Sequence, residues 1–423
     1  MLDIKEIRKN PDFFKDRLKV KNVSSDLIDD ILDLDKKRVS LSQNRDALRQ
    51  KQNEASKKIP QLQGEEKDQI LTEMKEISAQ LKDAEKNLAD VENSYNDIMY
   101  SLPNPPHESV PMGVDDEDNI EIKKWGEIRD FDFKPKEHWE LAEDLGILDT
   151  ERSAKISGSR FYFLRDELAI LQMALMNWAF IEIQKKGFSP TIPPFLVRDK
   201  ALFGTGFFPA DKNEIYTVNP GEDNLYLIGT SEVPLTSYYA DEVLDVDILP
   251  QRFAGYSPCF RREAGSYGKD MKGILRVHQF EKIEMVVVCA PEDSYKIHEE
   301  LMETEEYLLQ QMGIPYRVVN ICGGDLGGSA AKKYDLEAWL PGQNQYREMT
   351  SASNCTDFQT RRLNIRLKGK DGKTVFAHTL NGTAVSSRPL IAIMENFQNA
   401  DGSIDIPEVL QPFAGGLKKI EKK

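Results

Sequence analysis

"QRFAGYSPCFRREAGSYGKDMKGILRVHQFEKIEMVVV", residues 251–288, has the pattern of two β-strands joined by a long loop. The two ends of the stretch alternate between apolar and polar side chains, as half-buried strands do. The loop between them, residues 264–273, contains three glycines and alternating basic residues. The stretch therefore predicts an antiparallel hairpin, within a region that mixes helix and strand signals from about residue 125 onward.

The second predicted strand has a charged face and an apolar face. Alternation places on the charged face Arg276, His278, Phe280, Lys282 and Glu284. It places on the apolar face Val277, Ile283, Met285 and Val287. The charged face is not simple core, because unpaired buried charge is costly. It is either a solvated outer face or the floor of a pocket, in which Arg261 meets a phosphate or carboxylate and Phe280 stacks on a flat ring.

A different periodicity marks the N-terminal region. Apolar residues from 70 to 98 alternate in steps of four and three, which is the spacing of a coiled-coil seam. Residues 27–59 fit the same alternation if Arg38, Arg45 and Gln52 occupy seam positions, so we expect this seam to be half polar. Because Pro60 and Gly64 predict a helix end and a restart, we expect one antiparallel helical hairpin over about residues 26–100.

The first arm of this hairpin is locally basic, although the whole chain has a net charge of -15. The basic residues of the arm are Lys36, Lys37, Arg38, Arg45, Arg49, Lys51, Lys57 and Lys58. They form either a solvated face with ion pairs within the helix or a stripe that follows a nucleic-acid backbone. For Arg45, a structural place facing the opposite helix is an equal alternative.

Composition limits the class of protein. A chain of 423 residues with 40% hydrophobic and 30% charged residues is typical of a globular protein with two domains. We expect a cytoplasmic protein without a membrane span, because there is no apolar signal segment and the most apolar stretch contains polar residues. The four cysteines form no C-x-x-C pair, which argues against zinc and against a disulfide framework.

Common phosphate-binding loops are absent. Residues 368–374, "KGKDGKT", lack the first glycine of the P-loop pattern and instead predict a turn at Asp371-Gly372. Residues 322–330, "CGGDLGGSA", are rich in glycine but lack the G-x-G-x-x-G spacing. A proline-rich, acidic stretch at residues 101–119 is interpreted as a linker that closes the hairpin.

Several strings along almost the whole chain resemble the bacterial and organellar type of seryl-tRNA synthetase, a family of class II aminoacyl-tRNA synthetases. They are "LPNPPHESVPMG", "GTSEVPL", "FRREAGSYGKDMKGILRVHQFEKIEM", "DLEAWLPGQNQYREMTSASNCTDFQTRR" and "HTLNGTAVSSRPLIAIMENFQ". The resemblance implies an α+β fold, with an antiparallel-sheet catalytic domain flanked by helices and an N-terminal helical-hairpin arm. It implies a tRNA-binding domain at residues 1–105 and a catalytic domain at residues 106–423.

The resemblance also implies the reaction. Members of this family activate L-serine with ATP and transfer the seryl group to the 3′ end of tRNA(Ser); whether tRNA(Sec) is a second acceptor stays open. Motif 1, at about residues 166–194, forms a homodimer, and motifs 2 and 3 lie at about 252–288 and 378–398. The implied catalytic residues are Arg261, Glu348 and Arg388.

The implied ATP site consists of Arg261, Arg262, Glu263, Val277, Phe280, Glu348, Met349, Thr350, Ser351 and Arg388. In it, Arg261 grips the α-phosphate and Glu263 accepts a hydrogen bond from the adenine amino group. Phe280 and Arg388 sandwich the adenine ring. Glu348 and Ser351 bind Mg²⁺, an ion that prefers hard oxygen donors.

The implied serine site consists of Thr230, Glu232, Arg261, Glu284 and Thr383. Its carboxylates pair the ammonium group and reach the hydroxyl. Thr383 stands where many bacterial members carry serine, and it keeps a hydroxyl. The hairpin would recognise the long variable arm of the tRNA, with candidate contacts at Arg38, Arg45, Arg49 and Lys51.

Two other functions were considered. A class II paralogue that charges a carrier protein would lack the long helical arm. A coiled-coil interaction protein without catalysis would leave the combination of Arg261, Glu348 and Arg388 unexplained.

Overall fold

A computed structural model describes residues 1–264, 270, 272–369 and 372–423. The chain forms two compact units, Met1–Pro103 and Asn104–Lys423. Lys269 of the glycine-rich loop and Asp371 of the expected turn lie outside the described residues. The turn's flanking strands are described, and they pair antiparallel.

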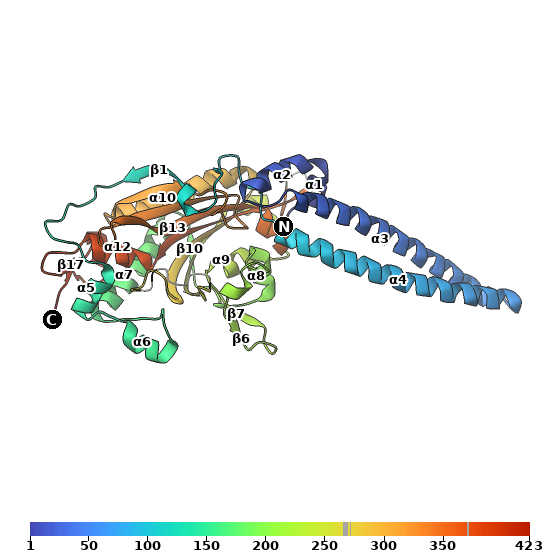
Figure 1. The fold of residues 1–423 in the computed structure, drawn as a ribbon, viewed down its shortest axis with the longest axis horizontal. Helices are drawn as coiled ribbons and strands as arrows, with labels where there is room; N and C mark the ends of the chain where they lie inside the picture. The colour runs from blue at the N-terminus through green and yellow to red at the C-terminus, as the bar shows by residue number, and fades with distance from the viewer. Residues whose placement is uncertain (265–269, 271, 370–371) are drawn as a thin grey trace. The chain divides into compact units, whose positions relative to one another are not determined.

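The N-terminal unit is a long antiparallel pair of helices preceded by two short helices (Figure 1). Its helices are α1 (Ile4–Lys9), α2 (Pro11–Val20), α3 (Asp26–Lys58) and α4 (Glu65–Ser101). A 3₁₀ turn, Ile59–Gln61, ends the first arm, and Gly64 precedes α4 with a φ of 62° that favours glycine. The helical arm is therefore confirmed, whereas the two short helices had no expected counterpart.

The seam between α3 and α4 is half polar, as the spacing predicted. Three expected apolar positions of α4 are buried, namely Ile77, Ala84 and Leu88. On α3, Arg38, Arg45 and Gln52 are half-buried at the polar seam positions. Gln52 Nε2 donates to Ser78 Oγ across the seam at 3.1 Å. Gln52 thus has a polar partner on the facing helix, whereas Arg45 bonds to Ser42 and Asp46 of its own helix.

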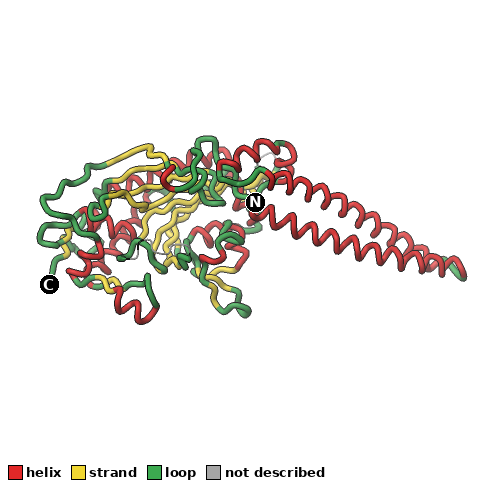
Figure 2. The backbone as a smooth tube through the Cα atoms, viewed as in Figure 1, coloured by secondary structure: helices red, strands yellow, loops and turns green. Residues whose placement is uncertain are grey.

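The second unit is built on an eight-stranded sheet flanked by helices (Figures 1 and 2). In spatial order the strands are β1 (Ile120–Trp125), β11 (Tyr316–Asn320), β12 (Lys332–Leu340), β13 (Gln345–Thr356), β16 (His378–Ser386), β10 (Gln279–Cys289), β9 (Gln251–Phe260) and β4 (Ser189–Thr191). Neighbouring strands are antiparallel except for β4 and β9. The predicted α+β fold class with an antiparallel sheet is confirmed.

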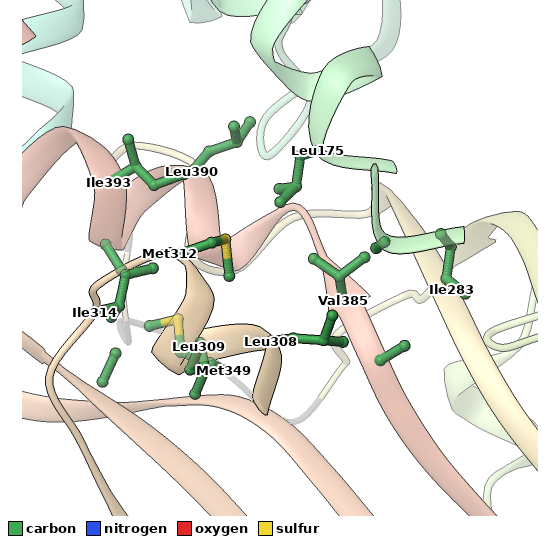
Figure 3. Packing of buried hydrophobic residues seen from close by; sticks show 14 of the residues in the cluster. Leu175, Ile283, Leu308, Leu309, Met312, Ile314, Met349, Val385, Leu390 and Ile393 are labelled. Carbon is green, nitrogen blue, oxygen red and sulfur yellow. The ribbon is translucent and has the colours of Figure 1, made fainter. Parts of the chain in front are cut away.

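Three helices cover one face of this sheet, namely α7 (Asp166–Lys185), α10 (Ser294–Gln311) and α12 (Arg388–Asn396). Their apolar side chains and those of the strands form the main core. Figure 3 shows Leu175, Leu308 and Leu390, one from each helix, gathered with Val385 of β16. Each leucine of this kind stabilises the fold by about 2 kcal/mol when it is removed from water. These three helices do not cover the opposite face of the sheet.

The remaining elements are short. The helices are α5 (His138–Leu145), α6 (Thr150–Ser157), α8 (Asp199–Thr205), α9 (Glu232–Thr236) and α11 (Phe358–Leu363). The strands of the small sheets are β2 (Leu148–Asp149), β3 (Phe163–Leu164), β5 (Leu196–Arg198), β6 (Thr217–Val218), β7 (Leu225–Leu227), β8 (Val243–Asp245), β14 (Arg366–Lys368), β15 (Thr374–Phe376), β17 (Ile404–Asp405) and β18 (Lys419–Ile420). Within the described part of the chain, no helix has both the length and the apolarity to cross a membrane.

The proline-rich segment after the hairpin is fixed to the second unit from Asn104 onward. Asn104 is buried, and its Nδ2 donates to the carbonyl oxygens of Ser329 and Cys355 at 2.9 and 2.8 Å. The N–H of His107 donates to the carbonyl oxygen of Ala331 at 2.8 Å. Much of the expected linker is therefore part of the sheet unit, because its backbone and side-chain polar groups are bonded there.

The two strands of the opening hairpin are shorter than the alternation predicted. Strand β9 ends at Phe260 and β10 begins at Gln279, so Arg276 and His278 lie outside the strand. Glu263, with a φ of 50°, has a left-handed backbone that does not continue a strand. From Phe280 onward the predicted alternation agrees with the structure, since the apolar side chains of β10 pack in the main core.

Candidate active site

A cavity of about 570 Å³ opens on the face of the sheet that α7, α10 and α12 leave uncovered. Strands β10, β13 and β16, the segment after β9 and the first residues of α9 and α12 line it. The expected ATP and serine residues that line it are Thr230, Glu232, Arg261, Glu263, Val277, Phe280, Glu284, Glu348, Met349, Ser351, Thr383 and Arg388. Of the expected residues in this unit, Arg262 and Thr350 are not in the lining.

A β-bulge decides which side chains of β13 reach the cavity. Glu348 and Thr350 pair with consecutive residues of β12, so Met349 is an extra residue in the strand. An extra residue shifts the alternation of side chains. As a result Glu348 and Ser351 both line the cavity, although an odd spacing would place them on opposite faces of a regular strand.

The same bulge turns Thr350 away from the cavity. Thr350 is buried on the opposite face, where its Oγ1 donates to Glu305 Oε2 of α10 at 2.8 Å. Burial raises the pKa of Glu305 well above its usual range. The side chain of Thr350 therefore does not line the nucleotide space as expected, because it hydrogen-bonds to a buried carboxyl group beneath the sheet.

A second bulge shapes β16. Val385 and Thr383 pair with consecutive residues of β10, which makes Ala384 the extra residue. Asn381 and Thr383 line the cavity before the bulge, and Ser386 lines it after the bulge. The spacing between cavity-lining residues on β16 is thus two before the bulge and three across it, whereas a regular strand keeps a spacing of two.

At one end of the cavity, two arginines lie against the expected nucleotide groups. The guanidinium of Arg261 lies 5.2 Å from the ring centre of Phe280, and Arg261 Nε donates to the carbonyl oxygen of Gly229 at 3.3 Å. Arg388 Nη1 lies 3.1 Å from Glu348 Oε2 and donates to the Glu348 carbonyl oxygen at 2.9 Å. In this structure the stacking face of Phe280 is therefore covered by Arg261, while Arg388 pairs with Glu348.

Glu348 is held in its ionised form. Burial acts to raise its pKa, but Arg388 and Lys333 outweigh burial and lower the pKa of Glu348 to about 2. Its side chain is nevertheless 45% exposed. An ionised carboxylate and the Ser351 hydroxyl on one cavity wall fit the oxygen donors that Mg²⁺ prefers.

These two residues alone do not complete a coordination shell. Over the described ranges, no cluster of three or more His, Cys, Asp or Glu side chains has the geometry to hold a metal ion. A magnesium ion commonly takes one or two protein ligands and completes its shell with water and substrate phosphates. Glu348 and Ser351 fit that limited role.

Glu263 and Arg262 have different positions, although they are adjacent in sequence. Glu263 lines the cavity, and its Oε2 accepts a hydrogen bond from Arg276 Nη1 at 2.7 Å. Arg262 is exposed, and its backbone N–H donates to the carbonyl oxygen of Glu214 at 2.9 Å. Arg262 is therefore not among the residues that line the cavity.

Glu232 lies at the other end of the cavity, on the first turn of α9. Its Oε1 accepts hydrogen bonds from Gln359 Nε2 at 2.8 Å and from Asn381 Nδ2 at 3.0 Å. Burial, followed by the nearby charge of Glu284, raises the pKa of Glu232 to about 7. The carboxyl group is therefore close to its titration point at neutral pH.

Glu284 faces the same space but has a charged partner. It forms a short ion pair with Lys282, the neighbouring cavity residue on β10. Thr383 Oγ1 lies opposite on β16 and donates to Glu284 Oε2 at 3.3 Å. The two carboxylates at this end thus differ in their partners. Glu284 pairs with the ammonium group of Lys282, whereas Glu232 accepts hydrogen bonds from side-chain amides.

Sequence reasoning did not assign four residues that take part in this arrangement. Lys282 was placed on the correct face of its strand but received no role. Asn381 lies two residues before Thr383, a spacing that could have identified it. Lys333 and Gln359 gave no signal, because their relation to the cavity depends on the tertiary fold.

The four candidate tRNA contacts of the hairpin have different surroundings. Arg38 pairs with Asp35 at 2.9 Å, and Arg45 pairs with Asp46 at 2.8 Å. Arg49 pairs across the seam with Glu85 at 2.7 Å. Lys51 is exposed and makes no ion pair with any residue that the structure describes.

Solved structures of two proteins resemble this fold along almost the whole chain. One is seryl-tRNA synthetase from Pyrococcus horikoshii complexed with ATP, with a TM-score of 0.91, 42% identity and coverage of 100% of both chains. The other is cytoplasmic serine-tRNA ligase from Naegleria fowleri in complex with AMP, with a TM-score of 0.85 and 35% identity. That match covers 98% of this chain and 96% of the other.

Family models match both parts of the sequence. Residues 216–397 match the class II tRNA synthetase core domain (G, H, P, S and T), and residues 1–106 match the seryl-tRNA synthetase N-terminal domain. The antiparallel sheet, its charged cavity and the core match define a class II aminoacyl-tRNA synthetase. Serine–tRNA ligase of Fervidobacterium nodosum is 45% identical over 420 residues, 98% of each chain. The chain belongs to the seryl-tRNA synthetase family.

Neither alternative from the sequence gains support. The N-terminal match argues against a paralogue without the helical arm, and the core match argues against a coiled-coil protein without catalysis.

Proposed function

We propose that the cavity activates L-serine with ATP, releases pyrophosphate, and then transfers the seryl group to the 3′ end of tRNA(Ser). One observation carries this proposal. The same cavity has an arginine-rich end with Arg261 and Arg388 and a carboxylate-rich end with Glu232 and Glu284. Joining the serine carboxylate to the α-phosphate of ATP requires both substrates in contact, and a shared cavity provides that proximity.

The residues at the arginine-rich end would hold ATP. Phe280 offers a ring face to the adenine once Arg261 turns from that ring toward the α-phosphate. Glu263 would accept a hydrogen bond from the adenine amino group, and the main chain near Val277 would complete the pocket. Arg388 would cover the other face of the adenine. Met349 lines the same wall.

The serine carboxylate is already a nucleophile, so activation needs no general base. Its oxygen forms a bond with the α-phosphorus, and the bond to the pyrophosphate oxygen breaks in line. Negative charge develops at the α-phosphate, where Arg261 would stabilise it. In the second step the terminal ribose hydroxyl of the tRNA forms an ester with the seryl carbonyl, and AMP leaves.

Magnesium would be held by Glu348 and Ser351 together with the phosphates. When bound, the ion would neutralise phosphate charge and help to orient the leaving group. The low pKa of Glu348, about 2, keeps the carboxylate available throughout the physiological range.

The carboxylate-rich end would select serine. Glu232 and Thr230 would receive the ammonium group, while Glu284 and Thr383 would receive the hydroxyl. Alanine would leave the hydroxyl-binding groups without a partner, a deficit that can reject an analogue by orders of magnitude. Threonine would be rejected if the groups that bind the serine hydroxyl leave no room for an additional methyl group.

The two units would divide the reaction between them, with residues 1–105 binding tRNA and residues 106–423 catalysing both steps. Basic residues of α3 would contact the tRNA backbone. Lys51 is the strongest of the four candidates, because Arg38, Arg45 and Arg49 already form ion pairs. The tRNA substrate is consistent with a cytoplasmic enzyme.

A homodimer through motif 1 is part of the proposal. Helix α7 carries exposed large apolar residues, Ile170, Met173 and Ile181, and Ile192 after β4 is exposed as well. Contiguous exposed apolar side chains are typical of subunit interfaces. Sedimentation of wild type and of Met173→Lys tests this, since the charged variant should shift the protein toward monomers.

The proposed function is tested by ATP–pyrophosphate exchange with serine, alanine or threonine, followed by charging of tRNA(Ser) and tRNA(Sec). We expect exchange with serine alone and transfer of serine to tRNA(Ser). Exchange that prefers another amino acid, or no exchange in folded protein, would contradict the proposed specificity.

A further inference from the structure

Glu232 differs from the other carboxylate at the serine end of the cavity in the groups that hold it. Neutral amide donors hold Glu232 Oε1, with Gln359 Nε2 at 2.8 Å and Asn381 Nδ2 at 3.0 Å. Glu284 instead pairs with the ammonium of Lys282. Glu232 forms no ion pair within the described part of the chain, so its charge stays available to a ligand.

Gln359 has a fixed side-chain orientation. It lies on α11 and is 1% exposed. Its Oε1 accepts a hydrogen bond from Thr379 Oγ1 at 2.7 Å, and its Nε2 also donates to the carbonyl oxygen of Thr205 at 3.0 Å. A flipped amide would direct its oxygen toward two other oxygens, those of Glu232 and Thr205. The surrounding groups therefore allow one orientation, with the amide nitrogen toward Glu232.

We propose that Gln359 is a positioning residue for serine recognition, which holds the Glu232 carboxylate toward the cavity without neutralising it, so that the substrate ammonium becomes its counter-ion. The inference rests on the proposed function of the cavity. A lysine or arginine at this position would orient the carboxylate equally well, but it would also supply the positive charge that serine has to supply. A buried amide provides the orientation alone.

The charges around Glu232 make this role measurable. The charged groups that act on it are Glu284 and Lys282 of β10 and Arg261 after β9. Burial and Glu284 raise the pKa of Glu232 to about 7, and the hydrogen bond from Gln359 opposes them, as do Lys282 and Arg261. Serine binding through an ammonium requires ionised Glu232, so binding should weaken below about pH 7. Loss of the Gln359 hydrogen bond should raise the pKa of Glu232, so that serine binding begins to weaken at a higher pH.

Gln359→Met tests the proposal, because methionine has a similar size and no amide. We expect the KM for serine in pyrophosphate exchange to rise about tenfold, the loss expected for one hydrogen bond to a charged group. The KM for ATP should stay within about twofold, and the acid limb of kcat/KM for serine should move to higher pH. Rescue by Gln359→Glu is not expected, since a second carboxylate would repel Glu232.

Gln172→Met is the matched control. Gln172 is another buried glutamine that donates to a glutamate, Glu281 Oε2, at 2.8 Å, and neither residue lines the cavity. Both methionine variants remove a buried amide that donates to a glutamate, and Gln359→Met also removes the hydrogen bonds with Thr205 and Thr379. The stability of each variant is therefore measured beside its kinetics. Only Gln359→Met should change the serine KM and its pH dependence.

A second variant, Thr379→Val, keeps the proposal testable if Gln359→Met does not fold. Thr379→Val keeps the shape of a buried side chain but removes the hydroxyl that fixes Gln359. It should shift the serine KM and the acid limb in the same direction as Gln359→Met, by a smaller factor. The proposal is overturned if both parameters stay at the wild-type values, or if serine and ATP are affected equally, as a general structural defect would predict. Absence of serine-dependent exchange in the wild type would instead overturn the proposed function.

Discussion

The helical hairpin and the sheet unit bring residues together in different ways. In the hairpin, positions meet in a regular series, since Arg38 lies over Tyr95 and Arg49 pairs with Glu85 further out. Each residue contacts a single partner helix, at a position along the helix axis that the repeat predicts. In the sheet unit, the cavity collects side chains from α9, β10, β13, β16 and α12. Periodicity alone can specify the first arrangement, whereas the second requires strand order and register.

The two regions also differ in how they are stabilised. Helix α4 has 37 residues, of which Ile77, Ala84, Leu88 and Met99 are buried. Helix α7 is shorter but buries several more large side chains in the main core of the sheet unit. An element with few buried apolar side chains opens at a lower free-energy cost than one in a deep core. The hairpin is therefore the region that can be altered with the least effect on the cavity.

The largest effect should follow a change confined to the cavity. Arg261→Ala should lower serine-dependent pyrophosphate exchange by about 10² to 10³, the loss typical for one preorganised group that stabilises developing charge. The rate at saturating serine and ATP is the measurement. Arg252→Ala, in which an arginine of β9 paired with Glu300 at 2.6 Å is removed outside the cavity lining, is the control. Equal losses in the two variants would contradict a specific role for Arg261.

Removal of the hairpin's outer part should separate the two regions functionally. The pairs Arg38–Tyr95 and Arg49–Glu85 show that the two arms can be joined between residues 42 and 90. With residues 43–89 replaced by a short turn, we expect charging of tRNA(Ser) to fall by about 10² while exchange stays within about twofold. Charging and exchange are measured on the same preparation. Unchanged charging would show that the basic stripe is an ordinary solvated face.

Acid should weaken the sheet unit through His298. This histidine is fully buried on α10, and its Nε2 donates to the carbonyl oxygen of Ala352 at 2.9 Å. Burial lowers its pKa from 6.5 to about 4. Between these values the unfolded chain binds a proton that the folded chain does not, so stability falls as the pH falls, by up to about 3 kcal/mol.

Urea unfolding at several pH values tests this difference between the regions. All four tryptophans and all five histidines lie after residue 103, so tryptophan fluorescence reports on the sheet unit. His298→Gln keeps a hydrogen-bond donor but cannot titrate, and it should flatten the dependence between pH 6.5 and 4. The same slope in wild type and variant would assign the acid sensitivity to other groups.

The smallest effect should come from one charge on the arm. Lys51→Glu should raise the KM for tRNA by a few-fold and reduce its salt dependence, because one phosphate contact is lost. Lys75→Glu, which changes an exposed lysine on α4, the other arm of the hairpin, is the matched control and should have little effect. Exchange should be unchanged in both variants. If Lys75 matters as much as Lys51, the contact is not specific to the basic arm.

The sequence predicted the hairpin more completely than the cavity. Steps of three and four residues gave the seam, including the half-buried Arg38, Arg45 and Gln52. The α+β class was implied by the resemblance, and the structure confirms it. Most of the ATP and serine residues that the resemblance implied do line the cavity, but the resemblance could not give their partners. The pairing of Gln359 with Glu232 joins residues far apart in the chain, and no local pattern carries that information.

The failures have a common physical cause. Thr350 was expected at the nucleotide, but the extra residue Met349 turns it toward Glu305. Arg276 and His278 were assigned to a strand that begins only at Gln279. Alternation had placed Arg276 and His278 on a strand, whereas Thr350 was an expectation from the resemblance. At both places the backbone departs from a regular strand. Bulges and strand ends depend on pairing with neighbouring strands, which one segment of sequence does not show.

The bulge at Met349 also marks a position at which the strand can lose a residue without changing the faces of the residues that follow. With Met349 deleted, Glu348, Thr350 and Ser351 would keep their partners on β12. Glu348 and Ser351 would then lie two residues apart in a regular strand and would still share the cavity wall, with Thr350 between them on the opposite face. For protein engineering, this means that a deletion of Met349 removes one side chain from the cavity wall. A deletion at a regular position after the bulge would instead turn the following side chains of β13 to the other face.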